Sequence, residues 1–160
     1  GASLSMALLT GYKALLARWS GQDDIVVGMP VAGRVRRDLE DGVGLYVNTV
    51  PVRTDLSGAP SFRELLHRVR RGALDADAHQ AVPFERIVER LSVARDPRRT
   101  PVFQVLFNML NLDDSLPPVP GLRTRLVESE DLAARFDLTL YVKPAADGSL
   151  GLDLVYDAAL

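Results

Sequence analysis

The sequence is poorest in the side chains that most often carry chemistry. Its 160 residues include no cysteine, two histidines and one tryptophan. The absence of cysteine excludes disulfides, thiolate metal sites and thiol nucleophiles. It also fits a reducing compartment, so we expect a cytoplasmic location.

Neither the charge nor the hydropathy of the chain points to nucleic acid or to a membrane. Nineteen basic residues stand against 21 acidic ones, a formal net charge of −2, so no global basic field would attract a polyanion. No apolar run approaches the roughly 20 residues that cross a bilayer. With 47% hydrophobic and 25% charged residues, the composition is that of an ordinary globular protein. We therefore expect one domain over residues 1–160 that binds neither nucleic acid nor membrane.

Apolar periodicity predicts a helix and two strands in the first third of the chain. Residues 4–19 have the three- and four-residue spacing of an amphipathic helix, which should end near Gly21. Residues 24–33 form a β-rich run broken by Gly28 and Pro30, and residues 43–56 alternate as a strand. The charged stretch 34–42 between them should be an exposed loop. The expected helix stripe consists of Leu4, Leu8, Gly11, Leu15, Leu16 and Trp19, and the expected strand faces are Val43, Leu45, Val47 and Thr49 against Tyr46, Asn48, Val50 and Val52.

The remaining elements follow from capping and turn signals. Ser61 and Glu64 have the spacing of a capping box, and Pro83 suits the first turn of a second, short helix. Residues 102–110 alternate as a strand, and the proline-rich stretch 111–121 should be an extended loop. Residues 135–142 and 150–156 should form two strands around the Asp147–Gly148 turn. The stripe of the helix after Ser61 should be Phe62, Leu65, Leu66, Val69, Ala73 and Ala76.

This order of elements limits the fold class. A helix, two strands, two helices, a strand, a long loop and a final hairpin predict an α/β or α+β two-layer sandwich.

Tests for an active site of ordinary type are negative. We interpret His79 as a helix-terminal residue bound to a backbone group or to Gln80, and His67 as solvated, because neither has a partner that would orient a general base. Two histidines twelve positions apart, without cysteine, predict no metal site. Neither a phosphate-binding glycine loop nor a nucleophile elbow is present. The short basic clusters 34–37 and 98–101 are more simply solvated charge than docking sites for an acidic partner.

Several segments nevertheless match, in order, the motifs of one known family of domains. The first is GQDDIVVGMPVAGR at 21–34. The second is a Gly-x-x-x-Asn-Thr strand that ends in Pro-x-Arg, and the third is a His-Gln-Asp-x-Pro-Phe-Glu step in which Ala81 replaces the aspartate. The fourth is an Arg-Asp-x-Ser-Arg-x-Pro segment in which Arg98 replaces the serine, and the fifth is RFDLTLYV, with Arg135 and Asp137. The matching residues of the three middle segments are Gly44, Asn48, Thr49, Pro51 and Arg53; His79, Gln80, Pro83, Phe84 and Glu85; and Arg95, Asp96, Arg99 and Pro101.

Together these segments resemble the C-terminal half of a condensation domain of nonribosomal peptide synthetases, and the resemblance implies both a fold and a division of roles between two lobes. It implies one lobe of a chloramphenicol-acetyltransferase-like fold, an α/β two-layer sandwich with a mixed sheet and helices packed on one face. In this family two such lobes enclose a tunnel, and a carrier-bound amine attacks a carrier-bound thioester to form a peptide bond. The family's catalytic His-His-x-x-x-Asp-Gly lies in the N-terminal lobe, and this sequence has no His-His pair. We therefore expect a C-terminal subdomain over 1–160, without the N-terminal lobe, that supplies no catalytic residue and is inactive alone.

The resemblance also suggests roles for single residues. We expect Asn48, Tyr46, Arg53, Gln104 and Asn108 to line the tunnel or contact the other lobe, although Asn48 could equally satisfy backbone groups at a strand irregularity. The loops 28–42 and 111–123 correspond roughly to regions that bridge the lobes and close the tunnel floor. The other motif residues should be structural: Gly44, His79, Gln80, Pro83, Phe84, Glu85, Arg95, Asp96, Arg99 and Asp137.

The implied partners are the N-terminal lobe, the upstream and downstream peptidyl carrier proteins and the adjacent synthetase modules. We expect the chain to bind no metal and no cofactor of its own, because the phosphopantetheine arms of the carriers arrive as substrates. Two alternatives stay open at this point. One is a non-catalytic module that binds carrier proteins, and the other is a lobe of an epimerization or cyclization relative.

Overall fold

A computed structural model gives the fold, and it describes residues 1–92, 96, 99–110, 120–123, 134–145 and 147–159. In chain order the elements are α1 (Leu4–Ser20), β1 (Asp24–Val31), the 3-10 turn η1 (Arg37–Leu39), β2 (Asn48–Asp55), α2 (Phe62–Ala78), α3 (Phe84–Leu91), β3 (Val105–Met109), β4 (Leu138–Pro144) and β5 (Leu150–Tyr156). No helix among the described residues is long and apolar enough to cross a membrane.

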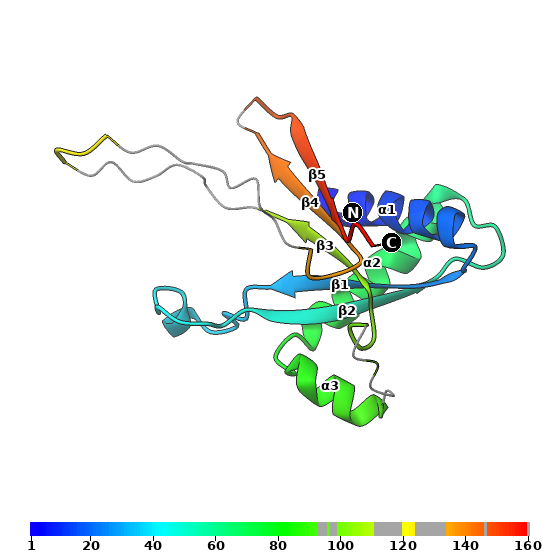
Figure 1. Ribbon diagram of the computed structural model, residues 1–160, viewed down its shortest axis with the longest axis horizontal. Coiled ribbons are helices and arrows are strands. Elements are labelled where there is room, and N and C mark those ends of the chain that lie inside the picture. Colours follow the sequence, from blue (N-terminus) through cyan, green and yellow to red (C-terminus); the bar gives the residue numbers. More distant parts are fainter. Residues whose placement is uncertain (93–95, 97–98, 111–119, 124–133, 146, 160) are drawn as a thin grey trace.

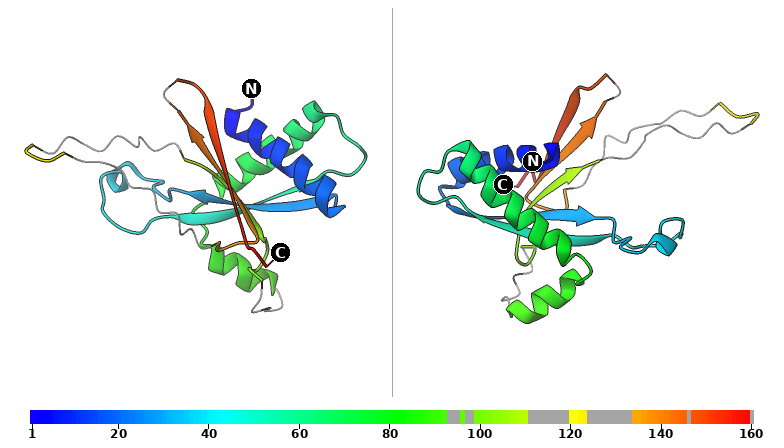
Figure 2. Two further views of the ribbon diagram at one scale, coloured as in Figure 1. Left: turned by 45° about the horizontal axis from the view of Figure 1, so that its top comes forward. Right: turned by 180° about the vertical axis from the view of Figure 1, so that it is seen from behind.

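The five strands form one mixed sheet in the order β2-β1-β3-β4-β5. β2 and β5 pair with their neighbours antiparallel, whereas β1 with β3 and β3 with β4 are parallel. Helices α1 and α2 lie together on one side of this sheet, and α3 lies beyond the β2 edge (Figure 1, Figure 2). The two-layer sandwich with a mixed sheet and helices on one face is confirmed.

The core fills the space between the sheet and the two long helices. Alternation sends one side chain in two from each strand toward the helices, and the buried cluster draws on α1, α2 and the first four strands. Its members are Leu9, Tyr12, Ile25, Val27, Val52, Leu56, Leu65, Val69, Phe107 and Val142. The opposite face of the sheet carries no long helix among the described residues.

Caps set the helix ends as the sequence predicts. Ser61 and Glu64 form the reciprocal capping box of α2, and α1 ends at Gly21 with φ +68°, a conformation that favours glycine. Gly148, with φ +83°, turns the chain between β4 and β5.

The predicted face of the first helix is only partly correct, because Leu8 and Leu16 pack against the core but other members of the stripe do not. Leu4, Leu15 and Trp19 are exposed at 53%, 42% and 68%, whereas Leu9, Thr10, Tyr12 and Lys13 are buried. This helix is apolar on most of its circumference, so spacing alone does not select the side that meets the sheet. In the second long helix the predicted stripe holds at Leu65 and Val69 and fails at Phe62, which is 56% exposed.

Two predicted strands are too long. The strand expected over 43–56 begins only at Asn48, because the antiparallel register ends where Val31 of β1 meets Asn48. Residues 43–47 therefore have no neighbouring strand within the described chain, and Val43 and Leu45 are 103% and 92% exposed. The strand expected over 102–110 is confined to Val105–Met109. The charged loop 34–42 contains one 3-10 turn, η1.

Candidate functional site

Residues from separate sequence motifs meet at one place, which we call the motif junction. It consists of Gly28 of β1, Asn48 of β2, Phe84 of α3, Phe103 before β3 and Phe136 before β4. These residues come from five segments that lie far apart in the sequence. At this junction, residues from motifs that are separate in the sequence therefore contact one another.

Asn48 forms the polar half of the motif junction. Its Nδ2 donates to the carbonyl oxygens of Gln80 at 2.8 Å and Val82 at 2.7 Å. Its Oδ1 accepts from the backbone N–H of Phe84 at 3.2 Å, the first residue of α3. A single amide thus holds the turn between α2 and α3 and caps α3 from a strand 36 positions away.

Phe103 forms the apolar half. It is only 2% exposed, and its ring centroid lies 5.3 Å from that of Phe84 and 5.6 Å from that of Phe136. A Cβ at Gly28 would stand 2.3 Å from the Phe103 ring, so this position has room only for glycine. Aromatic rings at such separations attract one another beyond the area that they bury.

A tight turn fixes the direction of the Phe103 ring. Val102 has φ +72°, and the Phe103 N–H donates to the Pro101 carbonyl at 2.9 Å. This is the γ-turn form that is rare and strained, above all for a β-branched residue. The surrounding packing must therefore hold Val102 in place.

Neither histidine is placed as a catalytic base. His79 caps the C-terminus of α2, and its Nδ1 lies 2.7 Å from the Asp75 carbonyl oxygen. A carbonyl only accepts, so Nδ1 is the protonated nitrogen of this contact. His67 is exposed on α2. The structural interpretation of both histidines agrees with these positions.

Tyr46 and Gly44 belong to a loop and not to a strand. The Arg34 guanidinium lies 4.5 Å from the centre of the Tyr46 ring, a cation–π contact, and Arg34 Nη1 donates to the Leu39 carbonyl at 2.5 Å. A Cβ at Gly33 would lie 1.8 Å from the Tyr46 carbonyl oxygen, and one at Gly44 would lie 3.1 Å from the Tyr46 ring. Tyr46 is thus the anchor around which the loop 33–47 folds.

The other three candidate tunnel residues do not gather in one pocket. Arg53 is exposed and binds both carboxylate oxygens of Asp24 across the β1–β2 pair, the closest at 2.8 Å. Gln104 donates to the Thr100 carbonyl at 3.0 Å. Asn108, half-buried, pairs in register with Tyr141. Since the preceding Phe107 belongs to the helix-side core, alternation places Asn108 on the helix-free face.

The remaining motif residues occupy surface positions or turns. Gln80 Nε2 donates to Asp77 Oδ1 at 2.9 Å, and the Pro83 carbonyl accepts from Arg86 N–H in the first turn of α3. The Asp137 carbonyl accepts from Asp157 N–H at the end of the hairpin. Glu85, Asp96 and Arg99 are exposed, and the Arg99 N–H donates to the Asp96 carbonyl. Arg95 lies outside the described residues, as do 111–119 of the predicted bridging loop.

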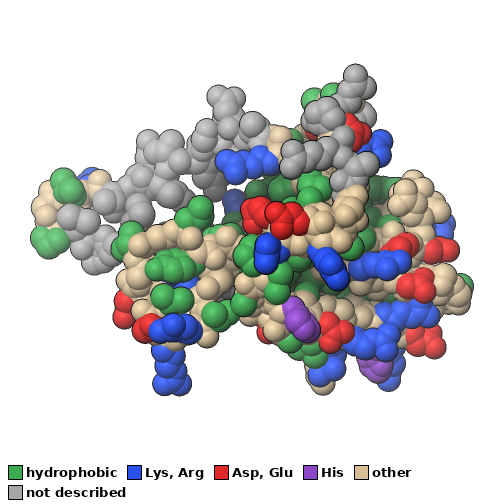
Figure 3. Space-filling view, turned by 90° about the horizontal axis from the view of Figure 1, so that it is seen from below, with side chains coloured by type: hydrophobic (Ala, Val, Ile, Leu, Met, Phe, Trp, Pro, Cys, Tyr) green, Lys and Arg blue, Asp and Glu red, His purple; other side chains and the backbone are tan. Residues whose placement is uncertain are grey.

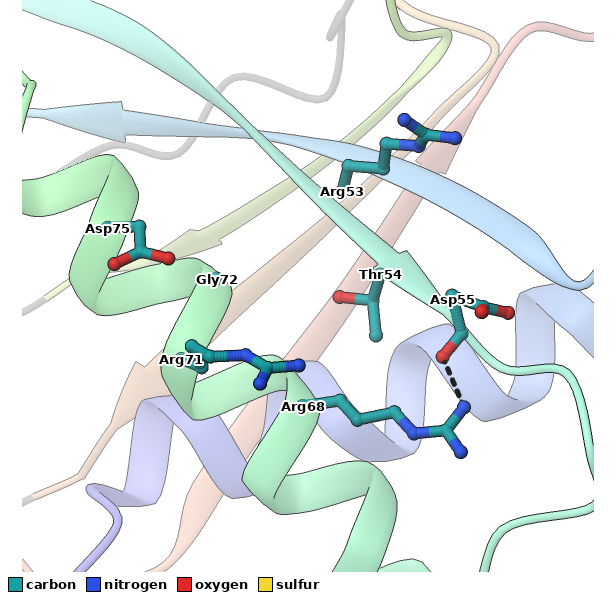
Figure 4. A pocket seen from close by; sticks show the side chains of 7 residues that line it. All are labelled: Arg53, Thr54, Asp55, Arg68, Arg71, Gly72 and Asp75. Carbon is teal, nitrogen blue, oxygen red and sulfur yellow. Dashed lines mark hydrogen bonds between the residues drawn. The ribbon is translucent and has the colours of Figure 1, made fainter.

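Two grooves open on the surface near these elements. One, of about 300 Å³, runs between α2 and β2 and is lined by Arg53, Thr54, Asp55, Arg68, Arg71, Gly72 and Asp75. Figure 4 shows Arg53 directed away from α2, while Arg68 reaches toward β2 and donates to the carbonyls of Asp55 and Ser57. The arginines of this groove therefore mostly serve the protein's own carboxylates and carbonyls.

The second groove, of about 590 Å³, lies along the outer side of α3. It presents apolar Val82, Ile87 and Leu91 beside three charged residues, Arg86, Glu89 and Arg90, and Arg86 lies 3.6 Å from the Glu89 carboxylate. Figure 3 shows that acidic and basic side chains alternate over this side of the molecule.

The sequence analysis missed the most unusual polar residue. Lys13 is fully buried, and its Nζ donates to the Val52 carbonyl at 2.5 Å and to Thr54 Oγ1 at 2.8 Å. Burial lowers the pKa of Lys13 to about 7, with Asp24 acting in the opposite direction. Beside it the Tyr12 hydroxyl is buried without a partner among the described residues, and burial raises its pKa. The available signal was a lysine inside an otherwise apolar helix.

The described carboxylates with a shifted pKa take part in an ion pair, a helix cap and two turns. Among the described residues no cluster of His, Asp and Glu could hold a metal ion, and within the same ranges each shifted carboxyl pKa is lowered, as for Asp24 beside Arg53 and for Glu64 beside Ser61. A general acid would need a raised pKa.

Comparisons with known proteins agree with the motifs. The sequence profile of the family described as "Condensation domain" matches residues 1–160. The chain is 42% identical over 160 residues to malpinin synthetase of Mortierella alpina, covering 100% of this chain and 2% of that protein. It is 46% identical over 156 residues to phosphinothricin tripeptide synthetase PhsB of Streptomyces viridochromogenes, covering 96% of this chain and 13% of that one.

Solved structures give the same result for the fold. The X-domain from teicoplanin biosynthesis has a TM-score of 0.86 and 30% identity, covering 99% of this chain and 37% of its own. A four-domain nonribosomal peptide synthetase bound to AMP and glycine has a TM-score of 0.85 and 26% identity, covering 98% and 13%. The chain spans a small part of each relative. Its motifs, its sheet and these likenesses together show that the chain belongs to the condensation-domain family of nonribosomal peptide synthetases.

Proposed function

We propose that the chain is the C-terminal lobe of a domain that forms a peptide bond between two carrier-tethered substrates. In this proposal the lobe supplies one wall of the substrate tunnel, and the general base lies on an N-terminal lobe. The absence of a His-His pair and the surface positions of both histidines support this division.

The observation that carries the proposal is the apolar loop at one end of the β1–β2 pair. Val43, Leu45 and Val47 are 103%, 92% and 61% exposed, although Tyr46 and Arg34 hold the loop in a defined shape. Soluble proteins seldom keep a group of apolar side chains so exposed unless another surface covers them. We assign that covering surface to the N-terminal lobe.

The side chains on the helix-free face of the sheet support the proposal that this lobe forms one wall of the tunnel. It carries polar side chains at half-buried positions, Asn108 and Tyr141, with Arg53 at its margin. Such a face can orient a substrate without exchanging protons with it. The downstream amine would attack the thioester carbonyl, forming the C–N bond while the C–S bond breaks and the thiol leaves on its phosphopantetheine arm.

The proposed substrates, partners and cellular location follow from this role. The carriers bring their phosphopantetheine arms as substrates, the chain itself holds no cofactor, and upstream and downstream carriers and adjacent modules are its partners. We place the protein in the cytoplasm, where such synthetases would find their substrates.

Reconstitution tests this function. The chain is combined with the lobe that carries His-His-x-x-x-Asp-Gly and with two loaded carriers, and the condensed product is measured by mass spectrometry. We expect product only with both lobes present, and at least a tenfold loss for Leu45→Ser. Leu74→Ser, at an exposed leucine of α2 (43%), is the matched control and should retain full activity. Product from this chain alone, or full activity of Leu45→Ser, would contradict the proposal.

A second candidate is a carrier-binding module without a catalytic partner. It is favoured by the groove along α3, where apolar Ile87 and Leu91 lie beside Arg90 and the Arg86–Glu89 ion pair, a surface that suits an apolar patch with charges of both signs at its border. Titration of the isotopically labelled chain with a carrier domain alone distinguishes the two candidate functions. Only the second function requires the chain to bind a carrier without any other lobe.

A further inference from the structure

The helix α3 is attached to the rest of the domain by very few contacts. No residue of α3 is buried, and in the ribbon views it lies apart from the α1–α2 layer, beyond the β2 edge (Figure 1, Figure 2). Eight residues are too few to form a stable helix alone in water. Its position must therefore depend on specific anchors.

Two anchors are present among the described residues, and both lie at the N-terminal end of α3. The first is the Phe84 ring, 5.3 Å from Phe103. The second is Asn48, whose amide makes the three hydrogen bonds to Gln80, Val82 and Phe84 described above. Pro83, the residue before the helix, makes no side-chain cap, so Asn48 takes over the role that a local Ser or Asp usually fills.

The geometry points to Asn48 as the positioning residue of α3. Its two donors close the α2–α3 turn and its acceptor begins the helix, so that one side chain sets both the direction and the start of α3. Because the apolar groove of Val82, Ile87 and Leu91 lies on this helix, the placement of that groove follows from Asn48. This inference rests on the contacts within the chain and does not depend on the proposed function.

The alternative is that Asn48 stabilises the whole fold rather than α3 in particular. The two explanations differ in which backbone amides exchange faster when Asn48 is replaced. Removing the anchors of α3 should open α3 in a local event, whereas loss of general stability raises exchange in every element. The readout is therefore residue-resolved hydrogen exchange of the 160-residue chain, followed by NMR, with global stability measured separately by urea unfolding.

We expect Asn48→Ala to speed exchange in the second turn of α3 at least tenfold, with α2 and β1 changing less than twofold. Asn48→Asp keeps an acceptor for the Phe84 N–H but turns a carboxylate toward two carbonyl oxygens. Its α3 should exchange faster than that of the wild type at neutral pH and regain protection as the carboxyl is protonated and can donate again.

The matched control is Ser61→Ala, which removes the ordinary cap of α2. It should loosen the first turn of α2 and leave α3 unchanged. Unchanged α3 exchange in Asn48→Ala, or an equal rise in every element, would overturn the assignment. If Asn48→Ala fails to fold, urea-dependent exchange of the wild type decides. A separate, low-denaturant opening of α3 supports the assignment, and α3 exchange only through global unfolding refutes it.

Discussion

The sheet has two very different ends. At the β2–β1 end, Lys13 binds Val52 and Thr54 from the helix side, the Phe103 ring covers Gly28 from the opposite side, and Arg68 binds the carbonyls of Asp55 and Ser57. At the β5 end Leu152, Leu154 and Tyr156 are 58%, 47% and 62% exposed. They share the face of Val142 through the β4–β5 register, but the buried core cluster reaches only as far as β4.

The difference shows how an edge strand is protected or left open. An unpaired edge presents N–H and C=O groups that another strand can bind. β2 is guarded by Pro51, which lacks an N–H, and by α2, whose Gly72 lies so close that a Cβ there would be 3.2 Å from the Arg53 carbonyl. β5 has neither proline nor lysine along Leu150–Tyr156. Within the described part of the chain, the β2 edge is covered, whereas the β5 edge pairs with no further strand.

The largest expected effect concerns Lys13 at the protected end. Its folded pKa of about 7 lies below the ordinary value of 10.5, so between these values the unfolded chain binds more protons than the folded chain. The free energy of unfolding should therefore rise with pH in this range, by about 2 to 3 kcal/mol between roughly pH 7 and 9.5.

Urea unfolding of the wild type and of Lys13→Met at both pH values measures this change in the free energy of unfolding. Between these pH values the free energy of unfolding of Lys13→Met should rise by about 2 to 3 kcal/mol less than that of the wild type, because methionine has no proton to release. Parallel curves for the two proteins would show that Lys13 does not titrate as its burial requires. The range stops below about pH 10, where ionisation of Tyr12 in the unfolded chain would begin to oppose the effect.

A pair of glycines compares the packing of the two ends directly. Gly28→Ala places a methyl group within 2.3 Å of the Phe103 ring and should cost about 2 to 3 kcal/mol of stability by overpacking. Gly151→Ala, on β5, meets nothing closer than 3.6 Å and should change stability by less than about 0.5 kcal/mol. Thermal unfolding of both variants decides, and equal losses would mean that the two ends are packed alike.

The smallest effect on stability, and the most specific, is expected at the open edge. The exposed apolar side chains of β5 predict that the chain self-associates at high concentration. Leu154→Lys should leave the free energy of unfolding within about 0.5 kcal/mol but weaken this association several-fold, since lysine on an edge strand discourages pairing. Leu74→Lys, at a leucine of similar exposure on α2, is the control. Sedimentation of the three proteins at increasing concentration measures the effect. Indistinguishable behaviour of Leu154→Lys and Leu74→Lys would exclude β5 as the associating surface.

Local signals predicted the element types well and their limits less well. The capping box at Ser61, the turn at Gly148 and the end of the first helix at Gly21 were correct because each depends on neighbours in the chain. The strand expected over 43–56 began five residues too early, because alternation is necessary for a strand but does not supply a partner strand. Val43 and Leu45 alternate correctly and still lie in a loop.

For the candidate site, too, the sequence identified residues but did not predict their contacts. The motif resemblance identified Asn48, Phe84 and the segment around Phe103, but it did not indicate that they touch. The sequence placed Asn48 equally at the tunnel and at a strand irregularity, and it did not predict the bonds of its amide to backbone groups of Gln80, Val82 and Phe84 between α2 and α3. Lys13 gave almost no signal, because a lysine in an apolar helix is usually solvated.

By itself, the sequence determined the family, the two-layer class and the absence of cysteine chemistry, since composition, local periodicity and motif order are properties of the chain in one dimension. Only the tertiary structure decided which side of α1 is buried, that Asn48 caps a helix 36 residues away, and that one edge of the sheet is guarded while the other is open. Those outcomes depend on which surfaces meet, and surfaces that meet are brought together by burial of the whole core rather than by the spacing of any one segment.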